Sequence, residues 1–480
     1  MIKYKMILLS TIFIPLAGAF FLPLLGRYNA RLRNIFSFIL IFSSFVLSLS
    51  LIPLVISGKT LIFARQFPQG FNLVFTADSL AVFMACVSAF LSTVILLYSF
   101  SYISHYENQN EYYSMVTLFL GAMMGLVFSA NLIFIYVFWE ITAVCSWRLI
   151  GFFREKHYIL RADKAFLITI FGSLLMLIGF ISIYQQAGSF DLAVIREVFK
   201  SRPLDNMVVL LLLCGIFAKS ATLPFQTWLP DAGIAPSPVT ALLHAAVLVK
   251  IGVYVFARIF VATFDVSFIW HTIIPCSAGV SALVAGGAAL IETDLKRIIA
   301  YSTISQIGFI FLGFALGKEI GIIGALLYIL MHGISKAGLF LCAGIVEQNT
   351  KTRDITSLGG LIKTMPLTAV SFLFCAFSVM GIPPFGGFFS KYMVFSAAAE
   401  SGNFYIIFLF LAGACLTIAY LFRVFNMVFM GETHGPEAIE GSPGMLACVV
   451  TLAILSLASG ILINFPFIFA KVATWQIMSH

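Results

Sequence analysis

The chain has 480 residues, of which 61% are hydrophobic and 10% are charged, and its formal net charge is +8. Soluble domains carry about a quarter charged and about half apolar residues, so this composition excludes an ordinary soluble enzyme. The basic residues lie in short segments between apolar runs, where membrane topology places them. We therefore expect an integral multi-pass protein whose surroundings are the lipid bilayer, with no nucleic-acid partner.

Apolar runs of membrane-spanning length recur along the whole chain and predict an all-α polytopic bundle of about fourteen transmembrane helices. The first run follows Lys3 and Lys5 as in a signal peptide, but it is long enough to span the bilayer, so we interpret it as a retained helix. The expected helices lie near 6–25, 34–57, 79–101, 113–129, 132–152, 164–186, 206–222, 237–261, 267–291, 298–316, 319–346, 366–400, 403–430 and 444–472.

The seventh and twelfth predicted helices are interrupted by proline, each beside a lysine. The seventh contains Lys219 and Pro224, and the twelfth contains Pro383, Pro384 and Lys391. Broken helices in corresponding places of two halves indicate an inverted-repeat transporter, and a repeat of five helices inserts with opposite topology. We predict one membrane domain, 1–480, made of N-terminal helices 1–3 (1–111), a first repeat (112–262), a second repeat (263–430) and a last helix (431–480).

Lysine and arginine in the short loops predict the orientation of the bundle. One side is the more basic, and it holds Arg27, Arg31, Arg33, Arg154, Lys156, Arg161, Lys296, Arg297, Lys351, Arg353 and Lys363. The positive-inside rule places that side in the cytoplasm, so both chain ends face outward. The expected location is the inner (cytoplasmic) membrane of a prokaryotic cell.

Several ionisable residues lie in the middle of apolar segments, where a charge costs at least about 2.5 kcal/mol and is a functional candidate by default. Glu140 needs a cationic partner or a proton, and Lys219 is the partner that we expect. The alternative is a static ion pair that fixes helix packing. The candidates for proton translocation are Glu140, Lys219, His244, Lys250, His332, Lys336 and Lys391.

Lysine suits a proton carrier because burial shifts its proton affinity readily, whereas a guanidinium stays charged. His332 and Lys336 are one helical turn apart and share a face. His244 and Lys250 are six residues apart, which is about 120° around a regular helix, so we expect Lys250 on the axial path and His244 beside it. A lone buried histidine is more often a hydrogen-bonded core residue than a proton carrier, and this alternative stays open for His244.

Other polar groups carry no prediction of a site. Ser220, Thr222, Ser302, Thr303, Ser305 and Gln306 could hold water between titratable groups, but such residues commonly pack helix against helix in membranes. The eight cysteines lie singly in apolar runs without the spacing of a metal or haem site. We therefore expect no cofactor and no metal.

Several motifs together resemble the antiporter-like membrane subunits shared by respiratory complex I, multisubunit cation/proton antiporters and membrane-bound energy-converting hydrogenases. The motifs cover most of the chain: Phe138-Trp139-Glu140, Lys219 through Trp228-Leu229-Pro230-Asp231, Ala235-Pro236-Ser237-Pro238 to Lys250, Glu292-Thr293-Asp294-Leu295-Lys296-Arg297, His332 to Lys336 and Gly386-Gly387-Phe388-Phe389-Ser390-Lys391.

This resemblance implies fourteen helices with two inverted five-helix repeats, a coupled pair of Glu140 and Lys219, central carriers at Lys250 or at His332 with Lys336, and an exit carrier at Lys391. It also implies partners: other membrane subunits and a hydrophilic iron-sulfur arm that performs the redox chemistry. The chain ends soon after the last predicted helix, so a shorter member of the family is expected, most similar to those of energy-converting hydrogenases.

The leading hypothesis is an ion-translocating subunit, without redox chemistry of its own, in a respiratory or hydrogenase-type complex. A stand-alone or multisubunit sodium/proton antiporter is the first alternative. A quinone-binding membrane subunit is the second, although no residues specify a pocket for the quinone. Sequence alone leaves the coupling ion open between H⁺ and Na⁺.

Overall fold

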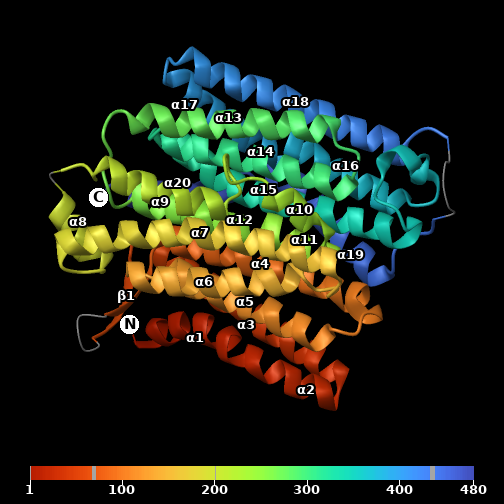
Figure 1. The fold of residues 1–480 in the computed structure, drawn as a ribbon, viewed down its shortest axis with the longest axis horizontal. Helices are drawn as coiled ribbons and strands as arrows, with labels where there is room; N and C mark the ends of the chain where they lie inside the picture. The colour runs from red at the N-terminus through yellow and green to blue at the C-terminus, as the bar shows by residue number, and fades with distance from the viewer. Residues whose placement is uncertain (1, 67–71, 201, 433–437, 480) are drawn as a thin grey trace.

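The protein is a bundle of long helices that run alongside one another, as the computed structural model shows (Figure 1). The structure describes residues 2–66, 72–200, 202–432 and 438–479. In this part of the chain, twelve helical segments are long and apolar enough to cross a membrane. Two shorter apolar helices, α9 (Asn206–Lys219) and α16 (Pro366–Met380), belong to the interrupted segments. The predicted all-α membrane fold is confirmed, whereas the count of fourteen spans stays a prediction.

The first third of the chain contains helices and one hairpin of strands. Its elements are α1 (Ile2–Gly18), η1 (Ala19–Phe21), α2 (Leu22–Tyr28), α3 (Ala30–Ile56), β1 (Leu61–Arg65), β2 (Leu73–Ala77), α4 (Ser79–Tyr102), η3 (Ile103–His105), α5 (Gln109–Phe128) and α6 (Leu132–Ile150). The strands pair antiparallel from Leu61 opposite Ala77 to Arg65 opposite Leu73. This hairpin was not predicted from the apolar runs.

The middle of the chain holds the first interrupted segment. Its elements are α7 (Lys156–Ala187), α8 (Leu192–Phe199), α9, α10 (Trp228–Asp231), η4 (Ala232–Ile234), α11 (Ser237–Ala241), η5 (Leu242–Ala246), α12 (Leu248–Phe256), η6 (Ala257–Val261), α13 (Trp270–Ile291) and α14 (Leu295–Ala315).

The last part of the chain begins with the longest buried helix and contains the second interrupted segment. Its elements are α15 (Glu319–Thr350), η7 (Ile355–Ser357), η8 (Leu361–Lys363), α16, α17 (Gly386–Glu400), α18 (Phe404–Phe429), α19 (Pro443–Ile461) and α20 (Asn464–Met478).

Asparagine and aspartate mark where many of these helices begin. The side chain of Asp78 accepts a hydrogen bond from the Ala81 N–H at the start of α4, and Asp294 does the same for Lys296 and Arg297 at the start of α14. Such caps satisfy N–H groups that have no partner within the helix. Boundaries that the apolar runs leave vague are therefore set by short polar residues.

One predicted continuous helix is wrong, and another is irregular. The run 444–472 is two helices, α19 and α20; Pro466 has no N–H for the Leu462 carbonyl oxygen, which accepts from the Phe465 N–H instead. The run 237–261 is one helical span, Ser237–Val261, as predicted, but it is not a regular helix. It contains two π-helical turns, η5 and η6, and Val247 between η5 and α12 has φ −130° and ψ −69°.

The helices form an inner and an outer set. The segment from α11 to η6 is buried, as are α14 and α15, whereas only 33% of the residues in the spans of α3 and α18 are buried. Both chain ends lie on the side of β1 and α8 (Figure 1), which we call the hairpin face. The inner set therefore carries His244, Lys250, His332 and Lys336 away from lipid, whereas Glu140 lies on α6, whose span is only half buried.

Candidate functional site

Glu140 and Lys219 lie next to each other, at the first of three groups of buried charged residues. Glu140 is in the middle of α6, and Lys219 is the last residue of α9. The Lys219 Nζ donates to the Trp139 carbonyl oxygen at 3.0 Å and lies 5.2 Å from the centre of the Trp139 ring. It is within electrostatic range of Glu140. Among the described residues, however, no ion pair joins the two, and the Glu140 Oε1 has no hydrogen-bond partner.

The chain around the first break is held by side chains from other elements. The indole N–H of Trp228 in α10 donates to the Ala218 carbonyl oxygen at 2.9 Å, and the Leu223 N–H donates to Ser281 at 3.3 Å. Asp231 at the end of α10 pairs with Lys164 and Arg297 at 2.7 and 2.9 Å. An interrupted membrane helix needs such partners, because the bilayer offers none to its freed backbone groups.

The second group, in the centre of the bundle, consists of His244, Lys250, His332 and Lys336. All four side chains are almost completely buried. His332 is within electrostatic range of the other three. The Lys250 Nζ and both ring nitrogens of His244 and of His332 make no hydrogen bond with any described residue. The centre therefore holds several titratable groups that protein atoms leave unsatisfied.

We expected the side chains of His244 and Lys250 to point about 120° apart around the helix axis. That angle assumed a regular α-helix, and the segment is not one. His244 lies in the π-helical turn η5, and the chain changes direction at Val247 before α12 begins. A π-helical turn closes its hydrogen bond over five residues in place of four, which alters the angle around the axis between residues on its two sides. His332 is within electrostatic range of both residues.

Close approaches at two glycines bring these groups together. A Cβ atom on Gly333 would lie 2.4 Å from the Lys250 Nζ and 2.6 Å from the Leu91 Cδ1. A Cβ atom on Gly252 would lie 2.0 Å from the Ser220 Oγ, the residue after Lys219. Neither distance is possible for a larger residue without displacement, so glycine allows α12 to approach both α15 and α9.

The ammonium group of Lys336 is hydrogen-bonded to a network of hydroxyl and amide groups. Its Nζ donates to the Ser302 Oγ at 2.5 Å and to the Ile299 carbonyl oxygen at 3.2 Å. The Ser302 hydroxyl and the Tyr420 hydroxyl are 2.6 Å apart, and the Gln306 amide lies 3.4 Å from Tyr420. The sequence analysis set Ser302 and Gln306 aside as packing residues. The signal that could have identified them is the four-residue spacing that places both on one face of α14.

Lys391, the third group, lies just after the second break. Its Nζ donates to the carbonyl oxygen of Met380 at the end of α16, at 3.3 Å, and lies 5.4 Å from the centre of the Phe309 ring. Lys336 is within electrostatic range of Lys391. The ammonium group therefore folds back to the break and faces the centre.

Lys296 was not singled out from the sequence as a site residue, because it was assigned to a loop. It is buried, and its Nζ donates to the Ala235 carbonyl oxygen at 2.8 Å and pairs with Glu347 at 2.9 Å. His244 is within electrostatic range of Lys296. A cavity of about 580 Å³ that opens beside Lys296 and Glu347 reaches the basic side of the bundle.

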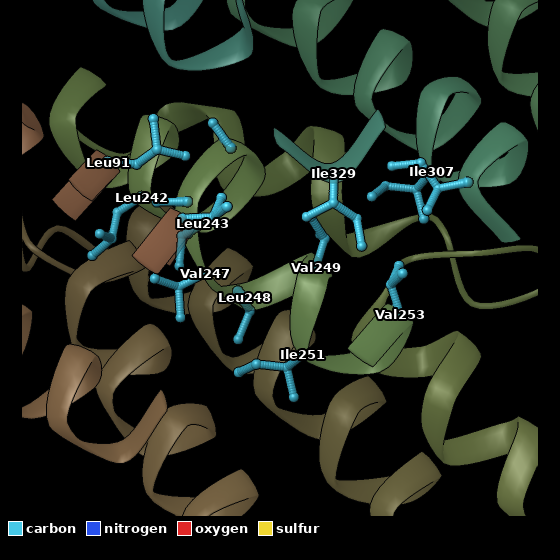
Figure 2. Close-up of a cluster of buried hydrophobic side chains, with 14 of the residues drawn as sticks. Leu91, Leu242, Leu243, Val247, Leu248, Val249, Ile251, Val253, Ile307 and Ile329 are labelled. Atoms are coloured by element: carbon cyan, nitrogen blue, oxygen red, sulfur yellow. The ribbon is translucent and has the colours of Figure 1, made fainter. Parts of the chain in front are cut away.

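Apolar side chains enclose the central group. Figure 2 shows Leu91 of α4, Leu243 of η5, Val249 of α12, Ile307 of α14 and Ile329 of α15 among a buried hydrophobic cluster. Apolar surroundings of this kind lower the local dielectric constant and so strengthen interactions between charges. Among the described residues, no three His, Cys, Asp or Glu side chains are arranged to hold a metal ion.

Comparison with known families agrees with this arrangement. Residues 129–417 match the family described as "NADH:quinone oxidoreductase/Mrp antiporter, TM". The chain belongs to this family. Residues 69–113 match a second family, described as "NADH-Ubiquinone oxidoreductase (complex I), chain 5 N-terminus". The predicted membership of the antiporter-like family is thus confirmed, and the protein is a polytopic membrane protein.

Curated relatives of this family member belong to sodium/proton antiporters. The chain is 36% identical over 428 residues to a Na(+)/H(+) antiporter subunit of Alkalihalophilus pseudofirmus, and the match covers 82% of this chain and 53% of the relative. It is 34% identical over 486 residues to a Na(+)/H(+) antiporter subunit of Staphylococcus haemolyticus, with 94% and 60% covered. The chain thus spans little more than half the length of these relatives.

Two solved structures share the fold over nearly the whole chain. A chain of the Mrp complex from Dietzia sp. DQ12-45-1b has a TM-score of 0.88 at 22% identity, with 100% of this chain and 98% of that chain covered. A chain of the membrane-bound sulfane sulfur reductase, an archaeal respiratory membrane complex, has a TM-score of 0.90 at 25% identity, with 98% and 97% covered. Every candidate site residue lies within the range of the first family match.

Proposed function

We propose that this chain translocates protons, or exchanges sodium ions for protons, as one membrane component of a multisubunit complex in the cytoplasmic membrane. In this proposal a proton moves between Glu140 and Lys219, then through Lys250, His332 and Lys336, and leaves by Lys391, with His244 connected to the centre. The organisation into two inverted repeats is part of the proposal.

The observation that carries the proposal is a row of buried titratable groups without ionic partners. Lys219, Lys336 and Lys391 donate to backbone carbonyl oxygens, and Lys250 donates to no described residue. A packing role would favour paired charges, since an unpaired buried charge is costly. A carrier role requires unpaired ones, because each amine must be able to gain and lose a proton at modest cost.

The position of Glu140 supports a partner protein in the membrane. Val137 and Val144, which flank Glu140 at helical spacing on α6, are 44% and 46% exposed. Glu140 thus lies at the edge of a side face of the bundle. A carboxylate at such a place is poorly accommodated by lipid, so we propose that a transmembrane helix of another protein in the complex covers this face.

The named relatives favour an antiporter complex among the possible assemblies, since both belong to sodium/proton antiporters. The likeness to a chain of a respiratory membrane complex favours the redox-driven alternative. A hydrophilic iron-sulfur arm remains a prediction. Identification of the proteins that copurify with this chain would decide between the two assemblies.

The transport proposal is tested by Glu140→Gln and Lys219→Ala in the assembled complex. Each removes one titratable group of the first pair and should lower the transport rate by at least about tenfold, which corresponds to ~1.4 kcal/mol of added barrier. The measurement is formation or exchange of a pH gradient in inverted membrane vesicles, normalised to assembled complex. Parent-like transport in both variants would show that the pair is structural.

Glu111→Gln is the matched control. Glu111 pairs with Arg148 at 2.6 Å and also with Arg154, but all three side chains are about one-third exposed. Exposed ion pairs contribute little to stability. The control loses one carboxylate charge near the same helix and should transport as the parent does.

A further inference from the structure

One face of α12 leads from Lys250 toward the hairpin face. Lys250, Tyr254 and Arg258 follow one another at four-residue spacing, with Arg258 in the π-helical turn η6. Residues four apart lie on the same face of a helix. At 1.5 Å per residue, Arg258 lies about 12 Å along the helix from Lys250.

At the end of this row of residues, Arg258 forms an ion pair with Asp78, the residue that caps α4. The Arg258 Nη2 donates to the Asp78 Oδ1 at 2.9 Å, and its Nη1 donates to the Asp78 Oδ2. The Arg258 Nε and Nη2 also donate to the Tyr254 hydroxyl, at 3.1 and 2.8 Å. The Tyr254 hydroxyl in turn donates to the Val127 carbonyl oxygen. These contacts tie α12 to the ends of α4 and α5.

A cavity of about 190 Å³ at the hairpin face ends on this ion pair. Asp78 and Arg258 line it together with the cationic Arg196 and the polar residues Thr60, Thr76, Ser129, Thr263 and Gln476. The side chains of Arg258 and Asp78 are 12% and 18% exposed. Tyr254 and Lys250, further along this row of residues, are fully buried. The ion pair thus lies between a polar cavity on one side and the buried residues Tyr254 and Lys250 on the other.

The geometry of α12 allows this ion pair to move. Two π-helical turns, η5 and η6, flank the helix, and Val247 departs from helical dihedral angles. Turns of this kind are frequent at functional sites. A shift of α12 would move Lys250 and Arg258 together, because Lys250 lies in α12 and Arg258 in the turn η6 that continues it.

We propose that Asp78, Arg258 and Tyr254 form a gate between Lys250 and the hairpin face. The structure shows the gate closed. When Arg258 leaves Asp78, water of the cavity reaches Lys250. The ammonium group then transfers one proton to a water molecule and becomes a neutral amine, and the water becomes a hydronium ion. The three gate residues are positioning residues, and the inference rests on the proposed function of Lys250.

The test measures access to position 250 rather than transport. Lys250→Cys is introduced into the assembled complex, and a small charged membrane-impermeant thiosulfonate is added to each side of oriented vesicles. Mass spectrometry of the peptide measures the labelling rate at position 250. Asp78→Asn is then added, since asparagine keeps the cap on Ala81 but loses the charge that holds Arg258.

We expect labelling from the hairpin face to become at least about tenfold faster with Asp78→Asn, because the open state should rise from a minor population to the dominant one. Labelling from the opposite face should not change. Arg258→Gln opens the gate from the other partner and should act in the same way. Glu111→Gln, which removes a carboxylate from an ion pair elsewhere, should leave the rate unchanged.

Equal labelling rates with and without the gate substitutions would overturn the gate. Failure of both gate variants to assemble would also overturn it, since the ion pair would then be a structural lock. The proposed function fails separately: faster labelling in a complex whose parent form moves no ions would keep the gate and refute translocation.

Discussion

Three of the four candidate lysines share one kind of contact, which the buried Lys296 also makes. The ammonium groups of Lys219, Lys336 and Lys391 donate to main-chain carbonyl oxygens at 3.0, 3.2 and 3.3 Å. A carbonyl dipole stabilises an ammonium group without cancelling its charge, so the charge still acts on its neighbours. This fits groups that must respond to a proton on the next site.

Lys391 offers the most direct test of a carrier at residue scale. Lys391→Glu keeps a titratable group at the break and should retain part of the transport. Lys391→Leu fills the space with an apolar side chain and should lower transport by at least about tenfold, as ~1.4 kcal/mol of added barrier would. Both rates are measured in reconstituted vesicles at equal amounts of assembled complex.

The contrast between glutamate and leucine separates the two roles of Lys391. A residue that only packs beside Phe309 should tolerate leucine better than a charged glutamate. Leucine variants that transport like the parent would make Lys391 structural, and the exit would then have to be sought elsewhere, for example at the proposed gate of Asp78 and Arg258.

At the scale of elements, the interrupted helices place the lysines. Lys219 ends α9, and the ammonium group of Lys391 folds back to the last residue of α16. Breaks in a membrane helix are tolerated only where protein or water satisfies the backbone. The sequence indicates both breaks through their prolines, but it does not show that Trp228 and Ser281 hold the first one.

The close contact between α12 and α15 predicts the effect of adding one methyl group at Gly333. Gly333→Ala would place a Cβ atom 2.4 Å from the Lys250 Nζ and 2.6 Å from the Leu91 Cδ1. Both are ends of flexible side chains, so the fold should survive while the Lys250 ammonium moves away from α15. Transport should fall several-fold at a nearly unchanged melting temperature, measured on the same purified complex.

Gly287→Ala is the matched control for this methyl group. Gly287 lies in α13, and a Cβ atom there would meet nothing within 4 Å. The control should transport as the parent does and gain slightly in stability, since alanine favours a helix over glycine. Equal transport in the Gly333 and Gly287 variants would show that the position of Lys250 against α15 is unimportant.

At the scale of the whole molecule, the candidate charged residues lie on α6, α9, α12, α15 and α17, and cavities lie at two faces of the bundle. The cavity of Lys296 and Glu347 opens on the basic side, and that of Asp78 and Arg258 opens on the hairpin face. Alternating access requires a closed path between two such openings. The bundle has this layout, with its apolar core between the two cavities.

The absence of redox chemistry in this chain is a prediction for the whole molecule. No cysteine spacing in the sequence matches a cluster or haem motif. Iron and zinc, measured by plasma mass spectrometry on the separated chain, should therefore be far below one per chain. Stoichiometric iron in a clean preparation of this chain would contradict its assignment to transport only.

The sequence by itself determined the membrane fold, most helix positions and both broken helices, and it nominated the seven candidate site residues, because charge and proline in an apolar run are costly enough to stand out. Only the tertiary structure showed the π turns beside Lys250, the split of the last helix and the network of Ser302 with Tyr420. It also showed the pairs of Lys296 with Glu347 and of Asp78 with Arg258. These features depend on contacts between residues far apart in the chain. The sequence does not show which distant residue a polar side chain near a helix end will contact.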